Sequence, residues 1–188
     1  MAALGSQGGG SSVSDNGFGI ALEDAVLTLT RYSDADISDH LAGEDEETAR
    51  RFGWWPNSST PETVKRALEE WAEHWRTNGP TRTFATREKE SGRLVGGCRL
   101  RLRSDGVALV SYWTSASERG KGYATRSLQL VCEYARSIGV TELEAEIADD
   151  NLGSRSVAER VGFANVEVFT EAGPSMCRYR KTFRLDRG

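Results

Sequence analysis

The most constraining feature of this sequence is the segment "RGKGYA" at residues 119–124, which joins a β-rich segment to a helical one. The preceding residues 107–114, "VALVSYWT", favour a strand. After the loop, apolar residues recur at intervals of four and three up to Ile138, and Gly139 is placed to end the helix. Glycines admit a close backbone approach, and the unpaired N–H groups at a helix start favour an anion. The loop is therefore either an anion-binding turn or an ordinary glycine-rich turn.

Two common phosphate-binding patterns do not fit this loop. The chain contains no GxxxxGKS or GxxxxGKT string, so a P-loop is excluded. A dinucleotide fingerprint needs a third glycine where Thr125 stands, and it belongs near the first strand of a doubly wound sheet. The pattern that remains is Arg-Gly-x-Gly-x-Ala between a strand and a helix.

The order of the other segments predicts one α/β (α+β) domain. Alternating β-rich stretches are expected as strands, and stretches with apolar residues three and four apart as helices. A strand at residues 25–32 precedes helices between residues 33 and 76, one of them opened by Thr60 and Pro61. The later segments are expected as strands at 81–88, 93–103 and 107–114, a helix, a strand at 141–147, a helix ending at Gly162, and strands at 164–171 and 175–185.

Composition limits the partners and the surroundings of the protein. A formal net charge of -4 reveals no strongly basic domain, which argues against nucleic-acid binding. The three cysteines lie far apart without a CxxC pair, so we expect no disulfide framework, no metal site and a cytoplasmic protein. No apolar run is long enough for a membrane helix. Residues 1–24 are expected to be a disordered Gly/Ser-rich tail or an expression remnant, and residues 25–188 one domain.

A second motif favours the anion-binding interpretation of the loop. In "NLGSRSVAERVGF", Asn151 is followed by Ser154 three residues later, and by Gly162 and Phe163 eleven and twelve residues later. Together with the glycine loop at this spacing, the motif resembles the GNAT superfamily of acetyl-CoA-dependent N-acetyltransferases. It is most similar to the Rim-type branch, which acetylates the N-termini of ribosomal proteins. The resemblance runs from about residue 26 to residue 183.

This resemblance implies a mixed, mostly antiparallel sheet of six to seven strands with helices on both faces. Two central parallel strands, residues 107–114 and 141–147, would splay apart and hold acetyl-CoA between them. The loop amides would hold its pyrophosphate, while the strand end and Asn151 would bind its pantetheine arm, although Asn151 could also simply cap a helix. The residues implied for cofactor binding are Trp113, Thr114, Arg119, Gly120, Lys121, Gly122, Tyr123, Ala124, Thr125, Asn151 and Ser154.

The implied chemistry is attack of a neutral amine on the thioester, with a proton supplied to the departing thiolate. Many relatives have a tyrosine where Ala158 stands, so the usual phenol is absent. We expect Ser154 either to donate the proton or only to cap the helix. A glutamate that relatives often carry is replaced by Leu109. Glu144 and Glu146 are the candidate bases, unless they form a solvated strand face.

In this family the first helices and their loop shape the acceptor pocket. Trp54 and Trp55 are expected either to wall that pocket or to pin the loop, whereas Trp71 is expected in the core. His40 and His74 have no evident partner in the sequence and are expected at the surface.

The acceptor is expected to be a primary amine, either a protein N-terminal α-amine or a small-molecule amine. Freeing an α-amine with a pKa of about 7.7–8.0 at pH 7 costs about 1 kcal/mol, against roughly 4.6 kcal/mol for a lysine amine. Without a committed base, the α-amine is the easier substrate. The alternatives are an antibiotic or polyamine acetyltransferase and a non-catalytic acyl-CoA-binding module of the same fold. A homodimer is a family-level possibility.

Overall fold

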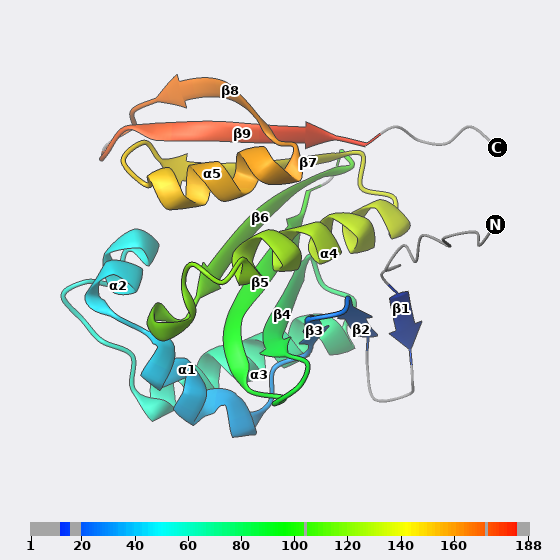
Figure 1. The fold of residues 1–188 in the computed structure, drawn as a ribbon, viewed down its shortest axis with the longest axis vertical. Helices are drawn as coiled ribbons and strands as arrows, with labels where there is room; N and C mark the ends of the chain where they lie inside the picture. Colours follow the sequence, from blue (N-terminus) through cyan, green and yellow to red (C-terminus); the bar gives the residue numbers. More distant parts are fainter. Residues whose placement is uncertain (1–11, 16–19, 104, 172, 184–188) are drawn as a thin grey trace, which may run out of the picture.

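The computed structural model describes residues 12–15, 20–103, 105–171 and 173–183 (Figure 1). Its strands are β1 (Ser12–Asp15), β2 (Ile20–Glu23), β3 (Leu27–Thr30), β4 (Thr81–Glu88), β5 (Leu94–Leu102), β6 (Val107–Thr114), β7 (Glu142–Ala148), β8 (Ala164–Phe169) and β9 (Met176–Thr182). Its α-helices are α1 (Ile37–Gly43), α2 (Glu46–Phe52), α3 (Pro61–Arg76), α4 (Tyr123–Ser137) and α5 (Leu152–Val161). Two 3-10 turns, Asp34–Asp36 and Ala116–Glu118, precede α1 and the glycine loop.

All the described strands belong to one sheet, in the order β1-β2-β3-β4-β5-β6-β7-β9-β8. The class and the mostly antiparallel pairing match the prediction, but the sheet has nine strands where six to seven were expected. The difference lies at the start of the chain, where β1 and β2 extend the sheet ahead of the predicted domain start at residue 25. Leu22 of β2 is buried in the core, so the domain includes this strand. The rest of the predicted tail, residues 1–11 and 16–19, lies outside the described residues.

The parallel pair β6 and β7 opens partway along its length. The two strands are paired only from Val107 to Leu109 on β6 and from Glu142 to Glu144 on β7. Beyond these residues, β6 runs on to Thr114 and β7 runs on to Ala148 without pairing to each other. The predicted splay between two central parallel strands is therefore confirmed.

Different helices cover the two faces of the sheet, as predicted. On one face α4 packs against β5 and β6, and a hydrogen bond of 3.2 Å joins Ser127 of α4 to Thr86 of β4. Figure 1 shows α4 and α5 in front of the strands, with α3 behind them. On that second face α3 packs against β4, and α1 packs against both α3 and β5. The largest buried core side chains include Phe84, Leu100, Leu128, Val131, Leu143 and Tyr179.

Local signals in the sequence account for several helix ends. Thr60 caps α3 by accepting a hydrogen bond from the Thr63 amide, and Pro61 occupies the first helical position. Gly162 ends α5 in the left-handed conformation, with φ of 91°. Within the described part of the chain, no helix combines the length and the apolar character that crossing a bilayer requires.

Candidate active site

The glycine loop between β6 and α4 is exposed and shaped by two left-handed glycines. Gly120 has φ of 80° and Gly122 has φ of 81°, a region that side-chain-bearing residues rarely adopt. No heavy atom lies within 4 Å of where a Cβ would stand at either position. The loop therefore has bare backbone on its outer side, with room for a ligand.

The first turn of α4 provides hydrogen-bond donors beside this backbone. Its early N–H groups have no acceptor inside the helix, as at any helix start. The structure gives the amides of Tyr123, Ala124 and Thr125 no other acceptor among the described residues. Together with the positive end of the helix dipole, these donors form a site for an anion.

The two basic side chains of the loop are already engaged by carboxylates. The Arg119 guanidinium pairs with Asp45 at 2.7 Å and with Glu47 at 3.1 Å, both at the start of α2. Lys121 pairs with Glu118 at 2.7 Å. These carboxylates therefore largely neutralise the positive charge that Arg119 and Lys121 were expected to offer to a bound anion. What Arg119 provides is a tether between the loop and α2, while its amide remains a predicted contributor.

The opening between β6 and β7 lies next to this loop and holds a pair of hydroxyl groups. Ser154 of α5 donates a hydrogen bond of 3.0 Å from its Oγ to the phenol oxygen of Tyr112 on β6. Tyr112 in turn donates to the Ser154 carbonyl oxygen at 2.9 Å. Burial raises the pKa of the Tyr112 phenol to about 12, so the phenol stays protonated at neutral pH. Asn151 accepts a hydrogen bond from the Ser154 amide and caps α5, the structural alternative considered for it.

Backbone groups at the end of β6 also face this opening. Trp113 and Thr114 pair with Gly97 and Gly96 of β5 on one side. On their other side no described strand pairs with them, because β7 has already diverged. Their placement is compatible with the predicted contact to an extended ligand arm.

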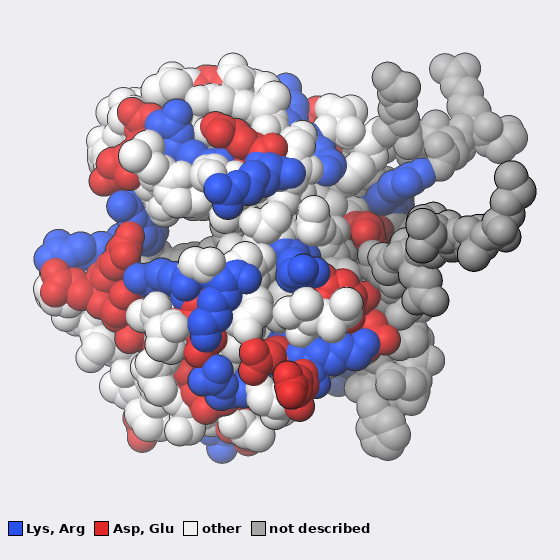
Figure 2. Space-filling view, viewed as in Figure 1, with Lys and Arg blue, Asp and Glu red and all other residues white. Residues whose placement is uncertain are grey.

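A hollow in the molecular surface marks the same opening. Figure 2 shows it on the face covered by α4 and α5, with charged residues across its outer end. There, Arg51 of α2 pairs with Asp150, the residue before the α5 cap, at 2.5 Å. The ion pair joins the two sides of the opening at its edge.

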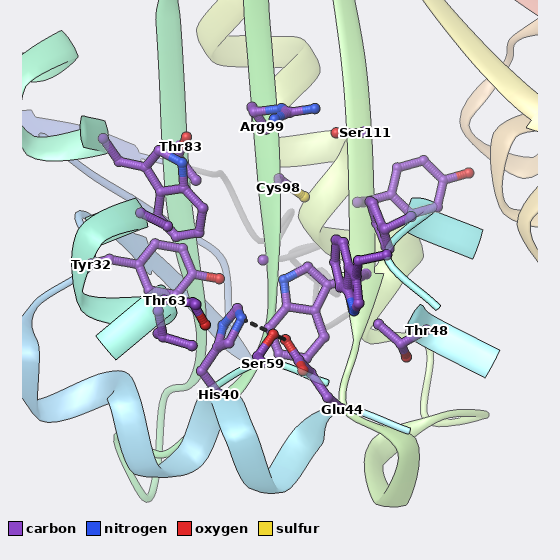
Figure 3. Close-up of a pocket in the computed structure, with 18 of the residues that line it drawn as sticks. Tyr32, His40, Glu44, Thr48, Ser59, Thr63, Thr83, Cys98, Arg99 and Ser111 are labelled. Atoms are coloured by element: carbon purple, nitrogen blue, oxygen red, sulfur yellow. Dashed lines mark hydrogen bonds and ion pairs between the residues drawn. The ribbon is translucent and has the colours of Figure 1, made fainter. Parts of the chain in front are cut away.

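A cavity of about 460 Å³ lies on the other face of the sheet, between the first helices and strands β5 and β6. Aromatic rings and polar side chains both line it, among them several tryptophans, serines and threonines (Figure 3). The lining residues that bear on its chemistry are Tyr32, His40, Glu44, Trp54, Trp71 and Trp113. Tyr112 also lines this cavity, so this residue of β6 borders both the cavity and the opening between the strands.

The floor of the cavity requires glycine in β5. A Cβ on Gly97 would lie 2.1 Å from the Tyr32 phenol oxygen and 2.7 Å from Nε1 of Trp113. A Cβ on Gly96 would lie 2.4 Å from the Trp113 carbonyl oxygen. The Tyr32 and Trp113 rings therefore reach the floor only because Gly97 carries no side chain, whereas Gly96 lets the backbone of β6 lie close to β5.

The tryptophans predicted for the acceptor pocket and the carboxylates predicted as bases have different outcomes. Trp54 lines the cavity, but Trp55 does not: its ring is exposed and is covered by the Arg50 guanidinium at 4.5 Å. Trp71, expected in the core, is a cavity wall instead. The carboxylates Glu144 and Glu146 do not line the cavity.

Glu144 and Glu146 are held by arginines of neighbouring strands and turns. Glu144 pairs with Arg103 at 3.3 Å and with Arg180 at 2.8 Å, and Glu146 pairs with Arg178 at 3.2 Å. A carboxylate stabilised by guanidinium groups is a weak proton acceptor. This arrangement argues against the proposed role of either residue as the base.

The polar groups inside the cavity were not predicted from the sequence. His40, expected at the surface, lies with its Nε2 atom 3.1 Å from Oε1 of Glu44, and both side chains are nearly buried. Because His40 and Glu44 are four residues apart, a helix would bring their side chains together, and this spacing could have predicted the contact. Tyr112 was also missed, because its partner Ser154 lies 42 residues away in the chain. The described residues contain no cluster of three metal-ligating side chains.

Comparisons with known proteins agree with this geometry. Residues 26–164 match the family model described as acetyltransferase (GNAT) domain. The chain is 27% identical over 138 residues to the uncharacterized N-acetyltransferase YjdG of Bacillus subtilis (strain 168), covering 69% of this chain and 82% of that protein.

Two solved structures illustrate the likeness in fold. RimL, a ribosomal alpha-N-protein acetyltransferase in complex with coenzyme A, superposes with a TM-score of 0.74 at 16% identity, covering 84% of this chain and 94% of its own. The microcin self-immunity acetyltransferase MccE, in complex with acetyl-CoA and AMP, gives a TM-score of 0.75 at 16% identity, covering 85% and 93%.

Proposed function

The chain belongs to the GNAT acetyltransferase family, and from that premise we propose that it transfers the acetyl group of acetyl-CoA to a primary amine held in the aromatic cavity. The observation that carries the proposal is the place where β6 and β7 diverge. On one side of this opening lies the anion-binding loop, and on the other lies the cavity. A ligand threaded through it would have a phosphate end and a reactive end in different environments.

In this proposal the cofactor-binding residues follow the opening from loop to cavity. The backbone of Arg119–Ala124 holds the pyrophosphate, with Thr125 offering a hydroxyl group. The backbone of Trp113 and Thr114, and the amide of Asn151, bind the pantetheine arm. The support is the exposed glycine backbone, the amides without acceptors and the unpaired strand end.

The proposed reaction is direct attack of the amine in a complex of enzyme and both substrates. The amine nitrogen forms a bond to the acetyl carbon as the bond from that carbon to sulfur breaks. An acceptor bound as its ammonium form first loses one proton to water. Tyr112 then donates its proton to the departing thiolate, and the proton lost by the neutral amine on attack restores the phenol through Ser154 or water, so the transfer step itself gains and loses no proton. Tyr112 thus takes the place of the phenol that is absent at Ala158. Its raised pKa suits a group that must remain protonated until it donates.

The acceptor class follows from the ion pairs that hold both carboxylates predicted as bases. Glu144 and Glu146 are both ion-paired, so we favour an amine that is easily deprotonated, such as a protein N-terminal α-amine or a small-molecule amine of similar pKa. We place the reaction in the cytoplasm. Cys98, Cys132 and Cys177 are all free thiols, as expected in a reducing compartment.

A panel of amines assayed by thiol release tests this function. The panel contains phenethylamine, dipeptide amides with free N-termini, spermidine and an aminoglycoside. Thiol release that depends on one of these amines supports acetyl transfer. Acetyl-CoA should also raise the melting temperature, because a ligand of the native state stabilises it, while ATP should not. Stabilisation by acetyl-CoA without turnover of any amine would favour a non-catalytic acyl-CoA-binding module instead.

A further inference from the structure

We propose that the cavity selects an amine with a single positive charge on an apolar body, and that Glu44 binds its ammonium group. This inference rests on the proposed function, since it names the class of acceptor that the same site takes. It excludes two of the acceptor classes left open by the sequence, the polyamines and the aminoglycosides. Figure 3 shows the residues that carry it.

Among the residues that the structure describes, Glu44 is the only carboxylate in the cavity lining. Its side chain is 11% exposed, and its Oε1 atom accepts hydrogen bonds from Nε2 of His40 at 3.1 Å and from Oγ of Ser59 at 2.9 Å. Burial raises the pKa of the Glu44 carboxyl, but the hydrogen bonds from His40 and Ser59 lower it further, so its pKa falls below the ordinary value. Glu44 therefore places a negative charge beside the aromatic walls of the cavity.

A hydrogen bond from His40 holds the Glu44 carboxylate in place. Nδ1 of His40 is buried and has no hydrogen-bond partner in the part of the chain that the structure describes. A proton on Nδ1 would be a buried donor without an acceptor, which is unfavourable. A proton on Nε2 is donated to Glu44. His40 therefore donates through Nε2 and orients the Glu44 carboxylate within the cavity.

The walls of the cavity suit a cation on an apolar body. Tyr32 and Trp71 lie with their ring centroids 4.9 Å apart, and His40 meets Trp113 at the same distance. Trp54 completes the aromatic lining. Faces of tryptophan and tyrosine attract an ammonium group, and their area favours an apolar body. An apolar ligand with a charged amine at one end matches this combination.

A second positive charge on the ligand would be unfavourable. Beyond Glu44, the lining offers no carboxylate to pair with it. It does contain Arg99 of β5, whose side chain is exposed and has no ion pair among the described residues. Because like charges repel, a polycation whose second charge lies near Arg99 is disfavoured. The same arginine tolerates a neutral or anionic group at the far end of the acceptor.

The first test compares acceptors on the wild-type protein. The probes are phenethylamine, phenylalanyl-alanine amide, spermidine and kanamycin, assayed by thiol release with saturating acetyl-CoA. Phenethylamine and phenylalanyl-alanine amide both carry a single positive charge on an apolar body. The one with the higher kcat/KM indicates whether the acceptor is a small free amine or a peptide N-terminus. We expect kcat/KM for the better monocation to exceed that of either polycation by at least about tenfold, the factor given by one charge-assisted contact. Preference for spermidine or kanamycin overturns the inference.

The second test measures charge recognition by Glu44 without turnover. With CoA replacing acetyl-CoA, the affinity of phenethylamine is compared with that of its neutral counterpart 2-phenylethanol. We expect the wild type to prefer the amine by about tenfold or more, and Glu44→Gln to lose that preference while still binding acetyl-CoA. Glu70→Gln is the matched control, because Glu70 faces His74 with the same spacing of four residues but lies outside the cavity. An unchanged preference in Glu44→Gln overturns the inference.

Arg99→Gln gives an independent reading should Glu44→Gln fail to fold. Arg99 is exposed, so its replacement is not expected to alter stability. In Arg99→Gln we expect kcat/KM for spermidine to rise relative to kcat/KM for phenethylamine. An unchanged ratio contradicts the proposed role of the Arg99 charge. If acetyl-CoA binds but no probe is acetylated, the proposed function is wrong. If probes are acetylated with a preference for polycations, only the inference about selectivity is wrong.

Discussion

The phenol oxygen of Tyr112 on β6 lies 3.0 Å from the hydroxyl oxygen of Ser154 on α5, across the gap where β6 and β7 separate. The residue where many relatives carry a phenol is Ala158, which is completely buried. The geometry thus brings a phenol to the gap from a strand rather than from the helix. Tyr112 also lines the cavity, so this residue borders both the opening and the cavity.

The first prediction concerns this phenol as a proton donor. Tyr112→Phe should lower kcat by about 10²-fold or more, the usual contribution of a positioned acid, and should leave KM for acetyl-CoA nearly unchanged. Steady-state kinetics by thiol release measures both values. Tyr134→Phe, a buried tyrosine of α4 away from the gap, is the control. Equal losses in the two variants would point to packing rather than proton transfer.

The second prediction concerns the exposed glycine loop. Gly120→Ala forces a side-chain-bearing residue into a left-handed conformation, costing about 1–2 kcal/mol of stability. It also places a methyl group where the pyrophosphate is proposed to lie. Gly139→Ala is closely matched, since Gly139 also has a positive φ, 86°, with no atom near its Cβ position.

Both glycine variants should therefore lose similar stability, while only Gly120→Ala should weaken acetyl-CoA binding, by about tenfold or more. Calorimetric titration with acetyl-CoA measures this affinity. Equal affinity of Gly120→Ala and Gly139→Ala for acetyl-CoA would move the pyrophosphate away from this loop.

The third prediction concerns the floor of the cavity. In Gly97→Ala the new methyl group would lie 2.1 Å from the Tyr32 phenol oxygen, so the ring must shift. Overpacking of this kind costs about 1–3 kcal/mol, and the shifted ring should raise KM for the amine. Denaturant unfolding and steady-state kinetics measure the two effects. Adding Tyr32→Phe removes the clashing oxygen and should restore part of the stability, whereas purely additive losses would contradict this cause.

Features carried by neighbouring residues could be predicted from the sequence. The glycine loop, the helix after it and the strand before it form one continuous segment, so their order fixes where β6 ends and α4 begins. The divergence of β6 and β7 followed from the family resemblance that this segment carries together with Asn151 and Ser154. The start of the sheet was misjudged, because the short strand β2 is identified mainly by the burial of Leu22 against distant residues.

Features that depend on distant partners could not be predicted in the same way. Arg119 looked like a phosphate ligand until Asp45, 74 residues away, proved to hold its side chain. Glu144 looked like a base because its partner Arg180 lies on the last strand. Glu44 and His40 are close in sequence, but only the packing of α1 against β5 makes them part of a cavity.

The last prediction uses the contact between Arg119 and Asp45. The Arg119 guanidinium holds the pKa of the Asp45 carboxyl well below its ordinary value, and Asp45 also caps α2 through the Thr48 amide. Because the pKa of Asp45 is lower in the folded state than in the unfolded state, this contact stabilises the protein above the unfolded value of about 3.9. The stabilisation is lost as the pH falls through and below that value.

Asp45→Asn should therefore be less stable than the wild type at pH 7, and the difference should shrink as the pH falls below about 4. Denaturant unfolding between neutral and acidic pH measures the difference, with the exposed Glu69→Gln as a surface control. Since Arg119 also ties the glycine loop to α2, Asp45→Asn should raise KM for acetyl-CoA more than KM for the amine. A stability difference that does not vary with pH would show that Asp45 acts only as a helix cap whose side-chain charge is irrelevant.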